Sequence, residues 1–351
     1  MTSVFERSEL DKILNNYLFY SGSVDSFQKI PQGLYNNNYR IKIGKLSWVI
    51  KFYPSSANNS RTKLSHQLQS TLYDNGFPLA KLETTKDQSF FVEKDDSFYT
   101  VHQWVEGKHL SPLTDSNLIT NAAVTQIACS LAKMHRIVSS TSFVPPDEIN
   151  AIHWERLFSK SIEQCSSLMH RRSWHFSRFN SLKLKWRKSN FDGWIIDRLP
   201  FFLEIAKKLN DEIFHEDVFV NGNEIPIHND INWENIIFDS TGDLLAYIDF
   251  DNSIYADRLY EVGAAAIVIS GSDELKLKVF IEAYNDAFGE VCSDRVIYAA
   301  MVIKCLNSIL FSINSYLKGK IKNYQMLESW CLYLEKSLES ILTCHRTVRK
   351  Q

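Results

Sequence analysis

Hydrophobic and polar positions alternate along the first third of the chain. The alternation runs through Tyr39–Ile43, breaks at the turn Gly44–Lys45 and resumes through Trp48–Phe52. This arrangement is typical of a β-hairpin. Two more strand-like runs follow, Ser89–Glu93 and Phe98–Trp104, separated by a polar turn. The pattern predicts a mostly antiparallel sheet that is complete by about residue 105.

Apolar residues recur with helical spacing between the predicted strands, at Ser60–Asn75, and this spacing dominates the chain after residue 105. In Ser60–Asn75, the residues Leu64, Leu68 and Leu72 recur every fourth position, and Gly76 follows in the expected C-cap place. The helices predicted from such spacing are Ser8–Tyr20, Ser60–Asn75, Val124–Arg136, Asp273–Phe288, Val296–Leu317 and Gln325–Thr343.

A sheet followed by helices predicts an α+β fold with two parts. At 351 residues the chain exceeds one ordinary hydrophobic core. We therefore expect a small antiparallel-sheet lobe over residues 1–105 and a larger, mostly helical lobe over residues 106–351.

Composition and charge narrow the function classes. The chain is 44% hydrophobic and 23% charged, which is an ordinary globular balance. Its net charge of −2 argues against nucleic acid or an anionic membrane as a partner. The segment 153–202 combines tryptophans with arginines and lysines, as single-stranded nucleic-acid surfaces do. At this net charge, helices with a solvated basic face over an aromatic core are the favoured interpretation.

The chain is expected to be cytoplasmic. Its N-terminal residues are polar and charged, unlike a signal peptide. The apolar segment Val296–Leu317 is interrupted by Lys304, Asn307 and other polar residues, which favours a buried core helix over a membrane span. The six cysteines lie far apart, without metal-ligand spacing, and are read as reduced thiols.

The stretch Ile225–Asp251 carries the candidate chemistry. A short apolar run leads to Asp230 and Asn235, and a second run, Leu244–Ile248, delivers Asp249. A carboxylate that accepts a proton, followed by an amide and a second carboxylate, suits the holding of divalent metal and a hydroxyl against a nucleotide triphosphate. The alternative is a hairpin whose polar turn residues simply face water.

Two further residues enter this interpretation. Lys51 lies on the second strand of the predicted hairpin, where a lone lysine is usually exposed, and would supply a cation for nucleotide phosphates. His228 is interpreted as a residue that shapes the loop rather than a proton carrier.

The same residues resemble a known family. His228–Asn235 is similar to the HxDxxxxN catalytic loop of the aminoglycoside phosphotransferase and choline kinase superfamily, and Ile248–Asp251 is similar to its metal motif. Weaker likenesses in the same order are the nucleotide loop Gly33–Arg40, the lysine strand Val49–Phe52, the hinge His102–Gly107 and the helix end Leu131–His135.

This resemblance implies a protein-kinase-like fold that uses ATP or GTP with Mg²⁺. By it, Asp230 is the catalytic base, and Asn235 and Asp249 are metal ligands. The implied nucleotide-binding residues are Gly33, Asn36, Lys51, Gln103, Trp104 and Val105.

Two features depart from the family pattern. The helix expected to carry a glutamate partner for Lys51 has no acidic residue over Arg61–Tyr73, and Ser65, His66 and Gln67 stand near the expected position. The nucleotide loop has one glycine and three asparagines. Asparagine tolerates a positive φ better than most residues, so the turn can still form.

The acceptor is expected to be a small hydroxylated molecule, with cationic compounds among the candidates. Aminoglycosides and other hydroxylated amine antibiotics come first, followed by metabolic acceptors of homoserine, choline or amino-sugar type. Asp251, Asp257, Glu261 and Glu274 could offer carboxylates to a cationic acceptor, although charges on loops and helices are more often simply solvated.

Two alternatives in function remain open at this stage. A non-catalytic nucleotide-binding protein on the same fold is one, because Lys51 lacks its acidic helix partner. A protein kinase is disfavoured, because no activation segment with an APE-like end follows Asp249.

Overall fold

A computed structural model gives the structure in two compact units. It describes residues 7–30, 37–54, 59–95, 97–112, 115, 118–141, 143–146, 149–169, 182–212, 218–319 and 324–348. The first unit comprises Met1–His109, Val144–Ile149 and Glu234–Ser253. The second comprises Leu110–Phe143, Asn150–Trp233 and Ile254–Gln351.

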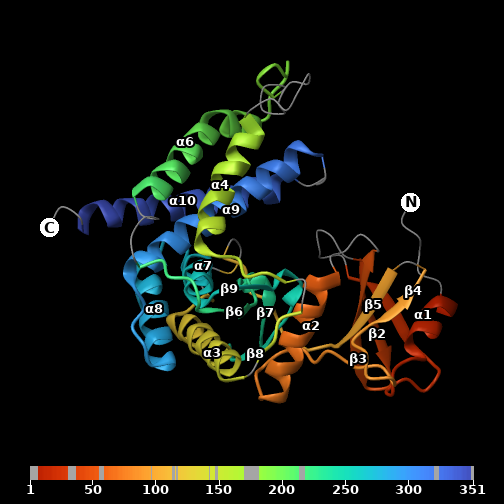
Figure 1. The fold of residues 1–351 in the computed structure, drawn as a ribbon. Coiled ribbons are helices and arrows are strands. Elements are labelled where there is room, and N and C mark those ends of the chain that lie inside the picture. The colour runs from red at the N-terminus through yellow and green to blue at the C-terminus, as the bar shows by residue number, and fades with distance from the viewer. Residues whose placement is uncertain are drawn as a thin grey trace. The chain divides into compact units, whose positions relative to one another are not determined.

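The first unit contains a five-stranded antiparallel sheet (Figure 1). In the order of their hydrogen bonding, its strands are β1 (Ser26–Lys29), β2 (Asn37–Ile43), β3 (Leu46–Pro54), β5 (Ser97–Gln103) and β4 (Val92–Lys94). The hairpin predicted from the alternating pattern is β2–β3, and its turn residue Gly44 has a φ of 60°. Such a positive φ is the conformation that glycine adopts without steric cost.

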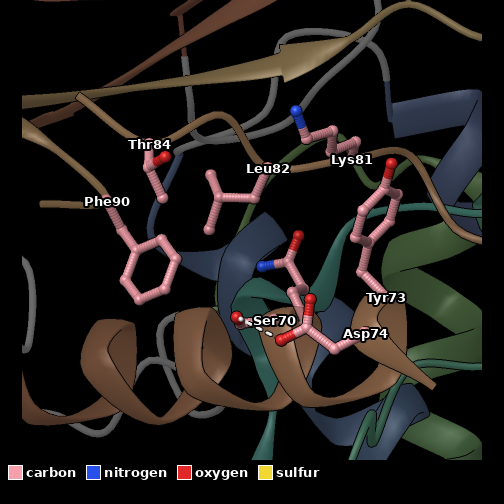
Figure 2. Close-up of a pocket in the computed structure, with 8 residues that line it drawn as sticks. Ser70, Tyr73, Asp74, Lys81, Leu82, Thr84 and Phe90 are labelled. Carbon is pink, nitrogen blue, oxygen red and sulfur yellow. Dashed lines mark hydrogen bonds between the residues drawn. The ribbon is translucent and has the colours of Figure 1, made fainter. Parts of the chain in front are cut away.

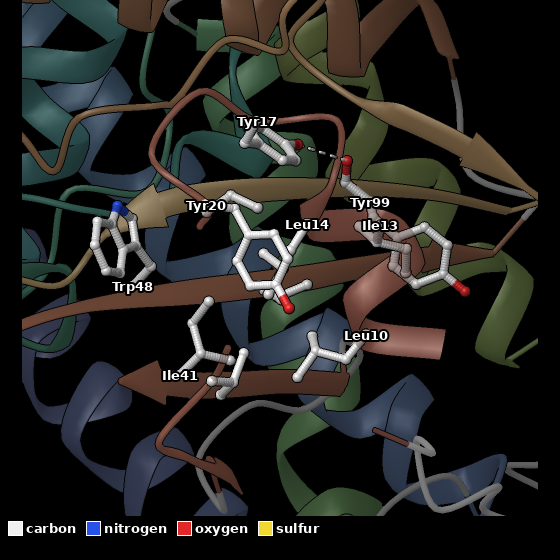
Figure 3. Close-up of a cluster of buried hydrophobic side chains, with 11 residues drawn as sticks. Leu10, Ile13, Leu14, Tyr17, Tyr20, Ile41, Trp48 and Tyr99 are labelled. Atoms are coloured by element: carbon white, nitrogen blue, oxygen red, sulfur yellow. Dashed lines mark hydrogen bonds between the residues drawn. The ribbon is translucent and has the colours of Figure 1, made fainter. Parts of the chain in front are cut away.

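One helix packs on this sheet through a cluster of buried apolar side chains. Helix α1 (Arg7–Leu14) contributes Leu10, Ile13 and Leu14, and Figure 3 shows them beside residues of the strands. The Tyr17 hydroxyl donates to the Tyr99 carbonyl at 3.5 Å. The helix is shorter than predicted, and the residues that follow it form part of the same core.

The second helix of this unit is α2 (Asn59–Asp74). Leu64, Leu68 and Leu72 are fully buried, as their spacing predicts, and Gly76 takes a φ of 67° after the helix ends. Helix α2 packs against the short 3₁₀ turn η2 (Phe250–Asn252), and Arg61 donates to the Asn252 carbonyl at 2.7 Å.

A small hairpin completes the first unit. Its strands are β7 (Ile236–Phe238) and β8 (Leu244–Tyr247), which follow the turn η1 (Trp233–Asn235). Lys108 and Phe238 exchange both backbone hydrogen bonds, at 2.8 and 2.9 Å. A Cβ on Gly107 would lie 2.4 Å from a methyl carbon of Ile237, so glycine permits this approach. The predicted metal-motif strand therefore folds together with the sheet.

The second unit is mostly helical. Its helices are α3 (Asn121–Ser140), α4 (Trp154–Met169), α6 (Asn190–Glu212), α7 (Arg258–Ser270), α8 (Glu274–Phe288), α9 (Asp294–Leu317) and α10 (Tyr324–Val348). It also holds the antiparallel strand pair β6 (Glu224–Ile227) and β9 (Ile254–Asp257). The sequence pattern did not predict α7, because every residue from Tyr260 to Ser270 is buried and no polar face marks the helical period.

Helix α9 is long and apolar enough to cross a membrane by composition alone. Yet 72% of its most apolar window is buried inside the protein. It packs most closely on α7, where a Cβ on Gly263 would lie 2.5 Å from the Ala300 Cβ. The prediction of a core helix over this segment is confirmed.

Candidate active site

Lys51 is buried and paired with two carboxylates. It lies on β3 opposite Thr100 of β5, and its side chain is 10% exposed. Its Nζ is 2.7 Å from Asp249 Oδ1 and 3.2 Å from Asp251 Oδ2. Lys51 and Asp249 are predicted from the sequence as parts of one site, and the structure brings them into contact.

Asp251 is held from two sides. The Tyr53 hydroxyl, two residues along β3 from Lys51, donates to Asp251 Oδ1 at 2.8 Å. Burial alone would lower the pKa of Lys51, but the charges of Asp249 and Asp251 outweigh it and hold that pKa well above its usual value. Lys51 is therefore a fixed cation, and Asp251 is the acidic partner that the helix sequence lacks.

Helix α2 offers Lys51 a neutral ring rather than a carboxylate. His66 is 2% exposed, and its ring lies near Phe90 and Phe91, with centroids 5.8 and 6.3 Å away. Burial, and secondly the charge of Lys51, lower the pKa of His66 to about 3. The imidazole is therefore uncharged at neutral pH and adds no repulsion to the Lys51 cation.

Asn235 and Asp249 lie beside each other in the backbone of the first unit. The Ile248 N–H donates to the Asn235 carbonyl at 2.9 Å, so the residue before Asp249 is tied to Asn235. Asp249 itself has φ 63° and ψ 59°, the left-handed region that a residue with a side chain rarely adopts. An amide oxygen and a carboxylate are hard ligands of the kind Mg²⁺ prefers, so these two residues fit the predicted metal.

Of the predicted hinge residues Gln103, Trp104 and Val105, two donate their backbone N–H to other described residues. The Gln103 N–H donates to the Lys81 carbonyl at 2.8 Å, and the Trp104 N–H donates to the Ser47 carbonyl at 2.9 Å. Val105 follows β5 and forms no such bond among the described residues. The Arg40 guanidinium lies 4.1 Å from the centre of the Trp104 ring. Of the three predicted positions, Val105 is the one whose N–H makes no backbone hydrogen bond with the described residues.

Gly33 and Asn36, the two nucleotide-loop residues implied by the resemblance, lie outside the described residues. Their contribution stays a prediction.

The loop that carries Asp230 belongs to the second unit and is fixed by buried polar contacts. His228 is fully buried, and its Nδ1 accepts the Asp230 N–H at 3.3 Å. Asn229 has a φ of 64°, and its N–H donates to Glu261. The other Glu261 oxygen lies 2.9 Å from His135 Nε2. These contacts support the interpretation of His228 as a residue that shapes the loop.

The Asp230 side chain has a neighbour that the sequence pattern did not reveal. Asn232 Nδ2 donates to Asp230 Oδ1 at 3.3 Å, and Lys304 Nζ lies 3.7 Å from the same oxygen. In the sequence, Lys304 stands out only as an interruption of an apolar helix. Because α9 follows Asp230 by more than sixty residues, no local pattern connects the two.

A small pocket in the first unit is separate from the predicted site residues. Figure 2 shows it above α2, with Ser70, Tyr73 and Asp74 on the helix side and Leu82 and Phe90 opposite. Its volume of about 160 Å³ is below the roughly 300–1,000 Å³ typical of ligand pockets. It therefore does not account for nucleotide binding.

Comparisons with known proteins identify a family and a fold for the chain. A family model described as the phosphotransferase enzyme family matches residues 26–295. Among solved structures, a spectinomycin phosphotransferase in complex with ADP and spectinomycin is 14% identical, with a TM-score of 0.68 and coverage of 96% of this chain and 98% of that one. No curated protein sequence matches the chain.

Two kinases named after other small molecules are similar as well. A microcompartment-associated aminopropanol kinase is 12% identical, with a TM-score of 0.62 and coverage of 98% of each chain. A choline kinase from Cryptosporidium parvum is also 12% identical, with a TM-score of 0.62 and coverage of 99% of this chain and 97% of that one. At these identities the likeness shows the fold, and the predicted kinase-like α+β fold is confirmed.

Proposed function

The chain belongs to the phosphotransferase enzyme family, and on that premise we propose that it transfers the γ-phosphate of ATP to a hydroxyl of a small molecule. Membership makes it a phosphotransferase that acts on small-molecule hydroxyl groups. The finer statement, with ATP as donor and named residues in each role, is our proposal. The observation that carries it is the buried Lys51, held as a cation beside Asp249 and Asp251.

Each residue of the proposed site has a defined task. Lys51 binds the α- and β-phosphates, and the backbone at Val105 binds the adenine. Asn235 and Asp249 would hold Mg²⁺, which neutralises phosphate charge when bound. Positioning and charge neutralisation carry most of a phosphoryl transfer, so a fixed cation and two oxygen ligands suit the reaction.

Asp230 is the proposed base. The acceptor oxygen forms a bond to the γ-phosphorus as the bond from that phosphorus to the β-phosphate oxygen breaks. The hydroxyl proton passes to the Asp230 carboxylate, and ADP is the leaving group. The buried His228 and Glu261 contacts fix the loop, so the carboxylate is oriented before the acceptor binds.

The proposal covers a small hydroxylated acceptor. From the sequence, hydroxylated amine antibiotics are the first expected acceptors, and metabolic acceptors of homoserine, choline or amino-sugar type are the second. Structures similar to this chain are named for spectinomycin, aminopropanol and choline, so they span both classes. The missing acidic partner of Lys51 favoured the alternative of a non-catalytic binding protein, and the Asp251 carboxylate beside Lys51 supports the catalytic proposal instead.

Phosphate transfer by an Asp230→Ala variant tests the proposal. ADP formation would be measured with ATP and Mg²⁺ across a panel of amine antibiotics, sugars, amino alcohols and hydroxy acids. We expect turnover by the wild type, its loss by a factor of about 10² or more in the variant, and unchanged ATP affinity. Asp95→Asn, an exposed change in the first unit, is the control. Full activity of Asp230→Ala would contradict the base assignment.

A further inference from the structure

Helix α9 is largely buried and mostly apolar, and Lys304 and Asn307 are among its polar interruptions. Lys304 and Asn307 are three positions apart, so they share one face of the helix. That face meets the loop of the proposed base, because Lys304 Nζ lies 3.7 Å from Asp230 Oδ1. The polar interruption noted in the sequence therefore coincides with the acceptor side of the proposed reaction.

Lys304 has charge to offer a ligand. Its side chain is 14% exposed, and it forms no hydrogen bond with the described residues. At 3.7 Å, its contact with Asp230 is an ion pair that is too long for a hydrogen bond. The ion pair with Asp230 and the partial exposure of Lys304 leave its N–H donors available for hydrogen bonds to a bound molecule. An anionic group on that molecule would accept those hydrogen bonds.

Two further polar side chains near Lys304 and Asp230, Asn307 and Tyr260, are neutral. Asn307 Oδ1 accepts from the Ser161 hydroxyl of α4 at 3.1 Å, and its buried Nδ2 forms no hydrogen bond with the described residues. Tyr260 also lies near the Asp230 charge. Burial first, and the nearby Glu261 second, raise the pKa of Tyr260 to about 12, so it stays protonated. These side chains can hydrogen-bond to an acceptor, but they add no negative charge.

Carboxylates expected to attract a cationic acceptor are already used inside the protein. Asp257 accepts from Trp154 Nε1 at 3.1 Å and from the Leu259 N–H at 2.7 Å. Glu261 is 1% exposed and accepts from the Asn229 N–H while it pairs with His135. The surroundings of Asp230 therefore present one cation and no spare carboxylate among these residues.

We propose that Lys304 binds a carboxylate of the acceptor, placed next to the hydroxyl that Asp230 orients. The acceptor is then a hydroxy acid or a hydroxy amino acid rather than a polycationic aminoglycoside, whose ammonium groups Lys304 would repel. This inference rests on the proposed phosphotransferase function and names the substrate class of the same site. It reorders the acceptor classes that the sequence left open.

Matched acceptor pairs test the inference. Each pair keeps the hydroxyl and differs by a carboxylate: homoserine with aminopropanol, serine with ethanolamine, and glycerate with ethylene glycol. We expect kcat/KM for at least one carboxylated member to exceed that of its partner by about 10- to 100-fold, the range that a hydrogen bond to a charged group supplies. Lys304→Met should remove this preference through KM, and Lys304→Arg should keep most of it.

Controls separate charge from folding. Lys278→Met removes the same charge from an exposed position of α8 and should leave the preference intact. Thermal unfolding checks that Lys304→Met is folded, as an apolar side chain in α9 should allow. A wild-type preference for the amino alcohols, or an equal loss of kcat for all acceptors in Lys304→Met, would overturn the proposal.

Measurements of acceptor binding distinguish a failure of the Lys304 assignment from a failure of the proposed phosphate transfer. If no member of any pair is phosphorylated, calorimetric titration of the same compounds in the presence of a non-hydrolysable ATP analogue decides. Tighter binding of carboxylated members by the wild type but not by Lys304→Met would keep the Lys304 assignment while the transfer reaction fails. Equal binding by both proteins would reject Lys304 as a carboxylate site.

Discussion

Lys51 and Asp251, 200 residues apart in the sequence, form an ion pair with Nζ 3.2 Å from Oδ2. Asp251 also accepts from Tyr53, so one carboxylate holds two side chains of β3. In this protein the last residue of the metal motif, rather than helix α2, supplies the second acid beside the lysine.

Asp251→Asn should therefore weaken both stability and nucleotide binding. Asparagine keeps an oxygen for Tyr53 but removes the charge that faces Lys51. We expect a loss of about 1–3 kcal/mol in the free energy of unfolding, the worth of a hydrogen bond between charged groups, and a KM for ATP raised several-fold. Urea unfolding and steady-state kinetics measure these. An effect no larger than that of the exposed Asp95→Asn would count against the pairing.

Acid should destabilise the first unit through His66. The unfolded chain binds a proton near pH 6.5, whereas burial and Lys51 delay protonation of the folded ring until about pH 3. Stability is therefore complete at neutral pH and falls as the pH drops from 6.5 toward 3, at up to about 1.4 kcal/mol per pH unit. His102, whose pKa is also lowered by burial and by Lys51, acts in the same direction.

His66→Phe should flatten this dependence. The phenyl ring fits beside Phe90 and Phe91 and cannot take up a proton. The difference in unfolding free energy between wild type and variant, measured from pH 7 to pH 4, isolates the histidine from titrating carboxylates. Replacing the exposed His109 by glutamine serves as the control. Parallel curves for wild type and His66→Phe would refute the expectation.

Asn229 should tolerate glycine but not alanine. Its φ of 64° suits glycine and asparagine, and a Cβ without a local hydrogen-bonding group costs about 1–2 kcal/mol there. Asn229→Gly should keep the wild-type melting temperature and kcat. Asn229→Ala should lower both, because the strain is relieved by moving the adjacent Asp230. Equal behaviour of the two variants would show that backbone conformation does not limit this position.

Gly107→Ala should destabilise the first unit. The added methyl would lie 2.4 Å from Ile237 Cγ2 and 2.6 Å from the Phe238 carbonyl, so the hinge or β7 must shift. Overpacking of this kind costs about 1–3 kcal/mol. Gly193→Ala is the matched control, because its Cβ meets nothing within 4 Å and alanine favours helix α6 by about 0.5–1 kcal/mol. Thermal unfolding should give shifts of opposite sign.

Much of the fold was predictable because local patterns reflect one-sided burial. The β2–β3 hairpin shows alternation, and α2 shows the fourfold spacing of Leu64, Leu68 and Leu72, since each element has one buried face. Helix α7 escaped prediction because it is buried on all sides. The Lys51–Asp249 contact was anticipated through the family motifs, not through periodicity.

Contacts between residues far apart in the sequence could not be predicted from local patterns. Asp251 closes the metal motif and Lys304 interrupts an apolar helix, but only the fold shows that one meets Lys51 and the other meets Asp230. The carboxylates Asp257 and Glu261 illustrate the reverse case. They looked available to a cationic acceptor, but the structure commits them to Trp154, His135 and backbone donors.

The close packing at Gly263 bears on how the acceptor would be recognised. Helix α9 rests on α7 with no room for a Cβ at Gly263, so the backbone under Lys304 has little freedom to move. A lysine on a rigid support loses less conformational entropy when it binds a ligand than one on a loop. Selectivity would then be preorganised, and a change of acceptor in a relative of this protein would require repacking of its core.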